Sequence, residues 1–316
     1  MIIRNSLILI LFVGTFMSSM AQGRQSAIVL NTPSGDIYGS LFVPAGDSST
    51  TVAIIIAGSG PTDRDGNQIM MRNNSLLMLS QALACKNIAT VRYDKRGIAS
   101  SRDAAPTEND IRLNDYISDA KGWADKMVRD GRFQKVVFIG HSEGSLIAMS
   151  AAASGAKVGG VVSIAGPGRT FDQVLKDQLG EQPPQIRDIA YSIIDSLQQG
   201  LKVSRVPFFL VSLFRPSVQN YLISMMRHNP QFEIRKVGVP VLIVQGDADI
   251  QVRMEDARLL AAANPHARLR VIAGMNHVLK NCPSIDKQMQ MATYINPTIP
   301  IDIHLVNEIV KFIKNL

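Results

Sequence analysis

The segment Lys135–Ser154, KVVFIGHSEGSLIAMSAAAS, constrains the fold more than any other part of the chain. It begins with an apolar, mostly β-branched run and continues, after a short turn, with small and apolar residues at helical spacing. The turn reads Gly-x-Ser-x-Gly, with Ser142 at its centre. So tight a turn has no room for side chains two positions before and after the serine, where Gly140 and Gly144 stand. A Ser-Gly turn can lack chemistry, but between a strand and a helix the pattern predicts an exposed, nucleophilic Ser142 hydroxyl.

Residues 1–21 have the features of a secretion signal. Arg4 gives a positive start, Leu7–Val13 an apolar run, and Ser19-Met20-Ala21 a small-x-small cleavage site. The apolar run is shorter than the about 20 residues that span a bilayer, and no cysteine follows it at the processing site. We therefore expect cleavage near Ala21, a secreted or periplasmic protein, and no stable membrane insertion afterwards.

Composition excludes several classes of protein. The formal net charge is +7, but the basic residues are scattered, so no nucleic-acid partner is expected. Cys85 and Cys282 are too few for a disulfide framework, and whether they pair is left open. No cluster of histidine, cysteine and carboxylate residues has metal-ligand spacing, so neither a metal nor an organic cofactor is implied. The oligomeric state is left open as well.

Apolar runs alternate with amphipathic segments along most of the chain. The first two runs, Ala27–Asn31 and Ile37–Val43, predict a hairpin. Further strands are predicted at Val52–Ile56, Ile88–Tyr93, Val136–Ile139, Val158–Ile164, Pro240–Val244 and Leu269–Ile272, and helices at Ser75–Cys85, Ile111–Val128, Glu255–Ala263 and Leu305–Ile313 and after Ser142. This alternation predicts one α/β domain over residues 22–316, with a doubly wound, mostly parallel sheet and a site at the carboxyl ends of the strands.

The alternation lapses between about residues 167 and 236, where apolar stripes recur at helical spacing. This segment predicts a helical cap inserted over the carboxyl edge of the sheet, where it would act as a lid. The stripes are best explained as the core of the cap itself. Phe208, Phe209 and Phe214 are candidates for facing a substrate pocket.

A serine hydroxyl needs a base within hydrogen-bond reach and a carboxylate that orients the base. Of the five histidines, only His277 lies just past a predicted strand, although a loop histidine can be incidental. His141, inside the turn, is expected to point elsewhere. Two carboxylates follow the next-to-last predicted strand: Asp249 has Gly-x-x-Asp-x-x-Val spacing, whereas Asp247 suits a turn cap. We therefore predict that Ser142, Asp249 and His277 are catalytic.

Acyl transfer also needs N–H donors for the developing oxyanion. The backbone N–H of Glu143, at the start of the predicted helix, is one candidate, and the helix dipole supports it. The second is expected in the loop Gly58-Ser59-Gly60, from Ser59 or alternatively Gly60. A plain glycine-rich turn is the competing interpretation of this loop.

The chain order serine, aspartate, histidine is that of α/β-hydrolases. In addition, the stretch Gly58–Asn67, GSGPTDRDGN, together with Tyr93–Gly97, YDKRG, resembles the EstD-type bacterial carboxylesterases. The chain is also similar to the broader serine aminopeptidase-like hydrolases of family S33. The resemblance runs from the hairpin to the last helix and implies the triad roles for Ser142, Asp249 and His277.

Some positions depart from the family pattern. Ala57 stands where many relatives have histidine, and Ala99 where many have glycine, so the geometry of the oxyanion loop is less constrained by the resemblance. Asp63-Arg64-Asp65 is expected to hold this loop through local ion pairs. Arg96 is expected to be a buried structural partner of Asp94 or of a nearby carbonyl.

The expected function is hydrolysis of small carboxylic esters with a short or medium acyl group. A serine aminopeptidase is the main alternative, and it would need an acidic anchor for the free amine. Glu181, Asp188 and Asp195 of the insertion are available, although they are typical of solvated helix faces. A thioesterase would use the same residues, and an inactive binding module would not require a complete triad.

Overall fold

The computed structural model describes residues 23–46, 50–105 and 107–316, so the predicted signal peptide and its cleavage site lie outside the described residues. The strands are β1 (Gly23–Thr32), β2 (Gly35–Pro44), β3 (Thr51–Ile56), β4 (Ala89–Tyr93), β5 (Lys135–His141), β6 (Gly160–Ile164), β7 (Val241–Gly246) and β8 (Arg268–Ile272). The helices of the core are α1 (Ser75–Ala84), α2 (Leu113–Arg129), α3 (Glu143–Ala153), α9 (Met254–Ala263), α10 (Lys287–Tyr294) and α11 (Ile303–Lys314). Two 3₁₀ helices, η1 (Ala99–Ala104) and η2 (Glu108–Asp110), precede α2.

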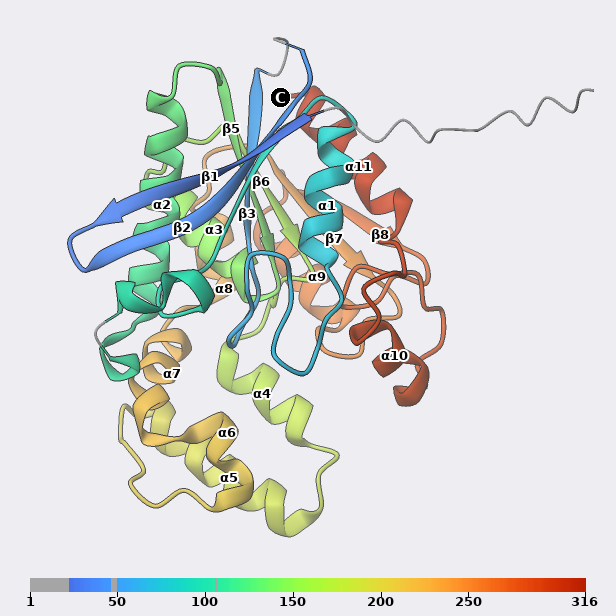
Figure 1. Ribbon diagram of the computed structural model, residues 1–316. Coiled ribbons are helices and arrows are strands. Elements are labelled where there is room, and N and C mark those ends of the chain that lie inside the picture. The colour runs from blue at the N-terminus through green and yellow to red at the C-terminus, as the bar shows by residue number, and fades with distance from the viewer. Residues whose placement is uncertain (1–22, 47–49, 106) are drawn as a thin grey trace, which may run out of the picture.

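The eight strands form one sheet in the order β1-β2-β4-β3-β5-β6-β7-β8 (Figure 1). The hairpin β1-β2 is antiparallel, β2 is antiparallel to β4, and all other neighbours are parallel. The predicted doubly wound, mostly parallel sheet is therefore confirmed.

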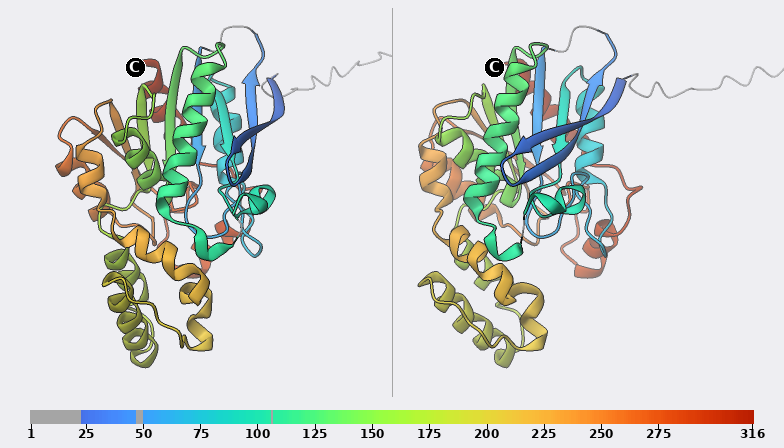
Figure 2. Two further views of the ribbon diagram at one scale, coloured as in Figure 1. Left: turned by 90° about the vertical axis from the view of Figure 1, so that its left-hand side faces the viewer. Right: turned by 60° about the vertical axis from the view of Figure 1, so that its left-hand side comes forward.

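The central strands are buried on both faces because their apolar runs are continuous. In β3, Val52, Ile54 and Ile56 pack into one core together with α2, α3 and α9. Ala53 and Ile55 point to the opposite face and pack with α1 and α11. The helices accordingly cover both faces of the sheet (Figures 1 and 2).

Only helices lie between β6 and β7, and all residues of this segment are described. They are α4 (Phe171–Leu179), α5 (Pro184–Gln198), η3 (Phe208–Leu210), α6 (Val211–Phe214), η4 (Pro216–Val218), α7 (Gln219–Met226) and α8 (Pro230–Arg235). Helices α4 to α7 share a separate apolar core and lie beyond the carboxyl ends of the strands (Figures 1 and 2). We call Phe171–Met226 the cap; the predicted domain limits at about 167 and 236 stay a prediction.

Helix α10 is a helix of the core that the sequence pattern did not predict, and the short η1 and η2 were not predicted either. Helix α10 has only eight residues, and its buried positions include the polar Gln290 and Thr293, so it has no apolar stripe. The cysteines are both free, with Cys85 exposed and Cys282 buried. Within the described part of the chain, every helix is too short or too polar to cross a bilayer.

Candidate active site

The turn between β5 and α3 has the backbone strain that its sequence predicts. Ser142 has φ 54° and ψ −121°, a conformation that non-glycine residues rarely adopt. A Cβ at Gly140 would lie 2.1 Å from the carbonyl oxygen of Gly144, and one at Gly144 would lie 2.2 Å from that of Ile56. Only glycine fits these two positions, so they hold the serine at the carboxyl edge of the sheet.

Asp249 lies in the turn after β7 with its carboxylate almost fully buried. Its Oδ2 is 2.8 Å from Nδ1 of His277, and its Oδ1 accepts hydrogen bonds from the backbone N–H groups of Gln251 (2.8 Å) and Val252 (3.0 Å). Burial raises the pKa of Asp249, but His277 and these N–H groups outweigh burial, and the pKa lies below its ordinary value. The carboxylate is therefore charged and fixed beside the imidazole.

Asp247, the other carboxylate of this turn, has a different partner. Its Oδ1 accepts a hydrogen bond of 2.6 Å from the backbone N–H of Gly274, in the loop after β8. Asp247 thus joins two loops of the carboxyl edge, while Asp249 contacts His277. The contact with His277 is consistent with the role predicted for Asp249, whereas Asp247 bonds to the loop after β8 rather than capping its own turn.

Ser142 and His277 line the same small cavity, which has a volume of about 80 Å³. His141 lines it as well, although we expected its side chain to point elsewhere. Its Nε2 donates to the carbonyl oxygen of His277 (2.8 Å), and the two ring centroids are 4.9 Å apart. Burial, and then the charge of His277, lower the pKa of His141 to about 3. His141 is thus a neutral support for the His277 backbone.

The loop after β3 lies directly against the serine turn. A Cβ at Gly58 would be 3.2 Å from Cβ of Ser142, so the two segments are in close contact. Within the described residues, the backbone N–H groups of Ser59 and Glu143 have no protein acceptor. Both are therefore free to bind an anionic oxygen, and Gly60 lies next to them with φ 71°.

Ion pairs anchor this loop to β4. Arg64 contacts Asp94 with Nη2 and Oδ2 2.6 Å apart, and Asp65 pairs with Arg92. Asp63 accepts hydrogen bonds of 2.8 Å from two backbone N–H groups of its own loop. These residues thus hold the loop, but the ion pairs are not local, because their partners lie on and just after β4, and Asp63 holds the loop by hydrogen bonds.

The expected pairing of Arg96 with Asp94 is wrong. Arg96 pairs with Asp119 of α2, with Nη2 and Oδ1 2.6 Å apart, and donates to the carbonyl oxygen of Ala104 (2.8 Å). Asp94 is unavailable because its carboxylate is bound by Arg64. The carbonyl contact was among the expected alternatives.

Gln290 of α10 connects the loops that carry Asp249 and His277. Its Nε2 donates to the carbonyl oxygen of Ala248 (2.9 Å), and its Oε1 accepts from Nδ2 of Asn276 (3.0 Å). The side chain is fully buried. The sequence contained no local signal for this contact, because the three residues belong to separate loops and an unpredicted helix.

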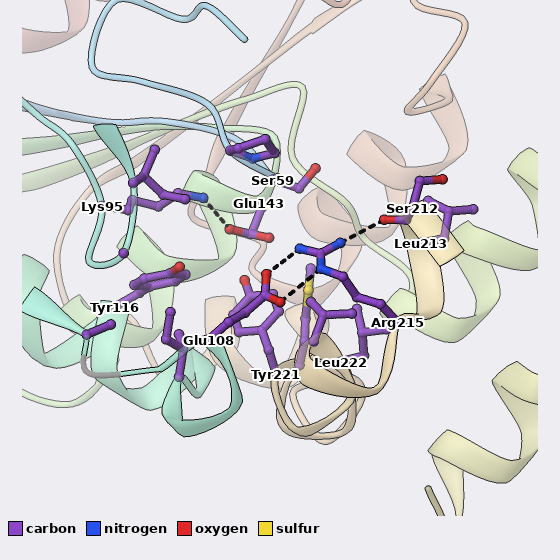
Figure 3. A pocket seen from close by; sticks show the side chains of 18 of the residues that line it. Ser59, Lys95, Glu108, Tyr116, Glu143, Ser212, Leu213, Arg215, Tyr221 and Leu222 are labelled. Atoms are coloured by element: carbon purple, nitrogen blue, oxygen red, sulfur yellow. Dashed lines mark hydrogen bonds and ion pairs between the residues drawn. The ribbon is translucent and has the colours of Figure 1, made fainter. Parts of the chain in front are cut away.

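A larger cavity of about 520 Å³ lies between the core and the cap (Figure 3). Its apolar wall includes Ile98, Ile111, Phe171, Leu213, Leu222 and Met225. Two ion pairs, Lys95–Glu143 and Arg215–Glu108, also border it. Ser59 lines both cavities, so they meet at the loop after β3.

The phenylalanines proposed to face the pocket do not line either of these cavities. Phe214 is fully buried in the cap core, whereas Phe208 and Phe209 are exposed. As for metals, the described residues contain no group of three or more histidine, cysteine or acidic side chains placed to hold an ion.

This sheet order, with a strained serine turn between β5 and α3 and an Asp–His pair after β7 and β8, defines the α/β-hydrolase class. Residues 74–281 match the model of the family described as serine aminopeptidase, S33, and the chain belongs to that family.

Individual relatives are more distant. Esterase EstD of Thermotoga maritima is 26% identical over 247 residues, which are 76% of this chain and 57% of EstD, so the chain spans little more than half of that relative. The structure of Est1E from Butyrivibrio proteoclasticus is 18% identical, with a TM-score of 0.58 over 92% of this chain and 98% of Est1E. Esterase Pf2001 of Pyrococcus furiosus is 15% identical, with a TM-score of 0.57 over 93% of this chain and 91% of Pf2001. The two structures share the fold.

Proposed function

We propose that this protein is a serine hydrolase that cleaves carboxylic esters through an acyl-enzyme. The observation that carries the proposal is the 2.8 Å contact between His277 and the buried Asp249, at the edge where the strained Ser142 turn lies. Membership of the family and the esterase names of EstD, Est1E and Pf2001 support the same reaction class.

In the proposed reaction, Oγ of Ser142 attacks the ester carbonyl while Nε2 of His277 accepts its proton. Nε2 is the basic nitrogen because Nδ1 donates its proton to Asp249. The backbone N–H groups of Glu143 and Ser59 bind the oxyanion, at the positive end of α3. His277 then protonates the leaving alcohol, and a water activated by the same ring releases the acid and restores Ser142.

The larger cavity supports a small ester with an apolar arm. Its wall is mostly aliphatic and aromatic, and it begins at Ser59, beside the proposed oxyanion site. We propose that it accepts a short or medium acyl group. A structure of Est1E carries bound ferulic acid (18% identical, TM-score 0.59, covering 90% of this chain and 98% of Est1E), which makes an ester of a phenolic acid a useful test compound.

The aminopeptidase alternative needs an unpaired carboxylate to bind a substrate amine. The carboxylates that line the larger cavity, Glu143 and Glu108, are already paired with Lys95 and Arg215. The three acidic residues named from the insertion form other ion pairs, Glu181–Lys287, Asp188–Arg187 and Asp195–Lys176, and line neither cavity. These pairings favour an ester substrate.

The test compares esters with amides on one preparation. p-Nitrophenyl acetate and butyrate, methyl ferulate, an acyl thioester and amino-acid p-nitroanilides are offered to the wild type, to Ser142→Ala and to Ser154→Ala. The last variant removes an exposed serine at the other end of α3 and is the matched control. We expect ester turnover and labelling by a fluorophosphonate in the wild type and in Ser154→Ala, and neither in Ser142→Ala.

Each other outcome identifies a different function. Anilide turnover with negligible ester turnover would make the protein an aminopeptidase, and a marked preference for the thioester would make it a thioesterase. If the folded wild type neither turns over any substrate nor reacts with the fluorophosphonate, a binding role would replace the enzymatic proposal.

We further propose that residues 1–21 direct the protein out of the cytoplasm. The charged start, apolar run and small-x-small site support this location. Expression with the native start, followed by cell fractionation and N-terminal mass determination, should find a mature chain that begins near Gln22. A full-length chain confined to the cytoplasm would contradict the proposal.

A further inference from the structure

A buried lysine contacts both segments of the proposed oxyanion site. Lys95 lies two residues after β4, and its side chain is 2% exposed. Its Nζ is 2.6 Å from the carbonyl oxygen of Gly58. The same Nζ is 2.8 Å from Oε1 of Glu143, whose side chain is also 2% exposed (Figure 3). The ring of Tyr116 lies 5.1 Å from the same ammonium. The ammonium thus joins the loop after β3 to the first residue of α3.

Both contacts are made to residues whose peptide groups carry the proposed donors. The carbonyl of Gly58 and the N–H of Ser59 belong to one peptide, and in a trans peptide these two groups point in opposite directions. Holding the carbonyl toward Lys95 therefore directs the Ser59 N–H away from it. Glu143 supplies the other proposed N–H from its own backbone. A single side chain thus constrains the orientation of both donors.

Charge adds to this geometric effect. A positive group on the carbonyl oxygen polarises the peptide and makes its N–H a stronger donor. The site is largely shielded from water at this point, because Gly58, Lys95 and Glu143 are all buried. Stability alone is a weak reason to keep a buried ion pair, since apolar side chains of similar volume often serve as well.

We propose that Lys95, with Glu143 as its counter-ion, is a positioning residue for the oxyanion site, which it keeps preorganised for the tetrahedral intermediate. The inference rests on the proposed function and extends it to residues outside the triad. Lys95 holds the peptide between Gly58 and Ser59, and Glu143 holds the ammonium. Preorganised donors stabilise the transition state more than the bound substrate, so the effect belongs mainly to kcat.

The test uses three variants with different charge balance. Lys95→Met removes the ammonium and leaves Glu143 unpaired. The double variant Lys95→Met/Glu143→Leu removes both charges and leaves no unpaired buried charge, so it is expected to fold even where the single variant does not. Arg96→Met is the matched control, because it breaks the neighbouring buried pair with Asp119, which does not contact the loop after β3.

For Lys95→Met and the double variant, we expect kcat to fall by about 10- to 100-fold with KM changed by less than about threefold. Trifluoromethyl ketones form a tetrahedral oxyanion on serine, so their Ki should rise by the same factor as kcat falls. Arg96→Met is expected to lower the melting temperature and to keep kcat within about threefold of the wild type.

The outcomes separate this inference from the proposed function. A folded double variant that keeps both kcat and the trifluoromethyl ketone Ki within about threefold of the wild type would overturn the inference and leave the proposed function intact. If the double variant lost no more kcat than Arg96→Met, the inference would also be overturned, because the loss would then reflect a general loosening of the fold. A wild type that neither cleaves esters nor reacts with a fluorophosphonate at Ser142 would overturn both.

Discussion

At the residue scale, the orientation of His277 depends on one buried carboxylate. An amide at position 249 has nearly the same shape, but its NH₂ group cannot accept the proton of Nδ1 of His277. We expect Asp249→Asn to lower kcat on p-nitrophenyl butyrate by about 10⁴-fold, because the ring loses the tautomer in which Nε2 is basic.

Asp247→Asn is the control for that substitution. Its amide oxygen still accepts from the backbone N–H of Gly274, so kcat should stay within about threefold of the wild type. The two variants differ in position by two residues and carry the same chemical change. If Asp249→Asn kept more than about a tenth of wild-type kcat, the role proposed for Asp249 would be wrong.

The same carboxylate makes stability depend on pH. Burial raises the pKa of Asp249, but His277 and two backbone N–H groups lower it below its ordinary value of about 3.9. A carboxyl with a lowered folded pKa stabilises the fold above its unfolded pKa, and the contribution is lost as pH falls through the folded pKa. The free energy of unfolding of the wild type relative to Asp249→Asn should therefore shrink below about pH 4. Urea unfolding between about pH 3 and 7 measures it, and a difference that grew on acidification would contradict the assignment.

Sequence patterns suffice to predict the position of residues that come just after a predicted strand. Ser142, Asp249 and His277 each follow such a strand, and the structure brings these strand ends to one edge. The contact between Lys95 and Glu143 joins residues 48 positions apart, and it depends on how the loop after β4 packs against the start of α3. Neither residue has a local pattern that distinguishes it from a solvated charge, so the pair could not be predicted.

At the scale of elements, α10 fixes the two loops on either side of the Asp–His pair. Gln290 connects Ala248 to Asn276, and Asn276 precedes His277 directly. Gln290→Met keeps the length of the side chain but removes its donors and acceptor, which leaves buried polar groups unpaired. We expect a loss of about 2–3 kcal/mol in the free energy of unfolding and a fall in kcat of about tenfold or more from misaligned loops.

Gln288→Met provides the comparison. Gln288 is exposed on the same helix, and its substitution makes the same change in side-chain chemistry. Its effect should stay within about 0.5 kcal/mol, with kcat unchanged. Urea unfolding and p-nitrophenyl butyrate kinetics on both variants measure the difference. Equal behaviour of the two variants would show that α10 does not support the site through Gln290.

Elements with a continuous or periodic apolar pattern were predictable, and short polar ones were not. Strands such as β3 and helices such as α2 and α11 have patterns that match their buried faces. Helix α10 buries Gln290 and Thr293 and exposes Met289, so its pattern runs against its burial. Tertiary hydrogen bonds, which local sequence does not encode, replace apolar burial in this helix.

At the scale of the whole molecule, an ion pair joins the cap to the core at the rim of the larger cavity. Arg215, between α6 and η4, pairs with Glu108 of η2 (Figure 3). Glu108 also accepts a hydrogen bond from Ser217 (2.5 Å). Burial raises the pKa of Glu108, but the bonds from Arg215 and Ser217 outweigh burial and leave the pKa lowered. Both charged side chains are more than one third exposed, so the pair should add little to stability.

The pair should instead restrict the position of the cap. Leu213 and Val218, on either side of Arg215, belong to the wall of the larger cavity, so a looser cap weakens apolar contacts with a bound acyl chain. We expect Arg215→Gln to raise KM for p-nitrophenyl butyrate several-fold, because about 1 kcal/mol of apolar burial of the acyl chain is lost. KM for the acetate, which has a shorter acyl chain, should change much less. The melting temperature should hardly change. Kinetics over a series of acyl lengths measure the effect.

Added salt and a second ion pair test whether loss of the Arg215–Glu108 pair causes the rise in KM for the butyrate. Lys176–Asp195 lies within the cap and does not reach the core, so Lys176→Gln should leave the dependence of KM on acyl length as it is in the wild type. About 0.5 M NaCl screens half-exposed charges, so it should move the wild type toward Arg215→Gln and leave that variant itself unchanged. An equal rise in KM for acetate and butyrate would mean that Arg215 acts on the serine site itself, and the cap would then have no separate influence on the choice of ester.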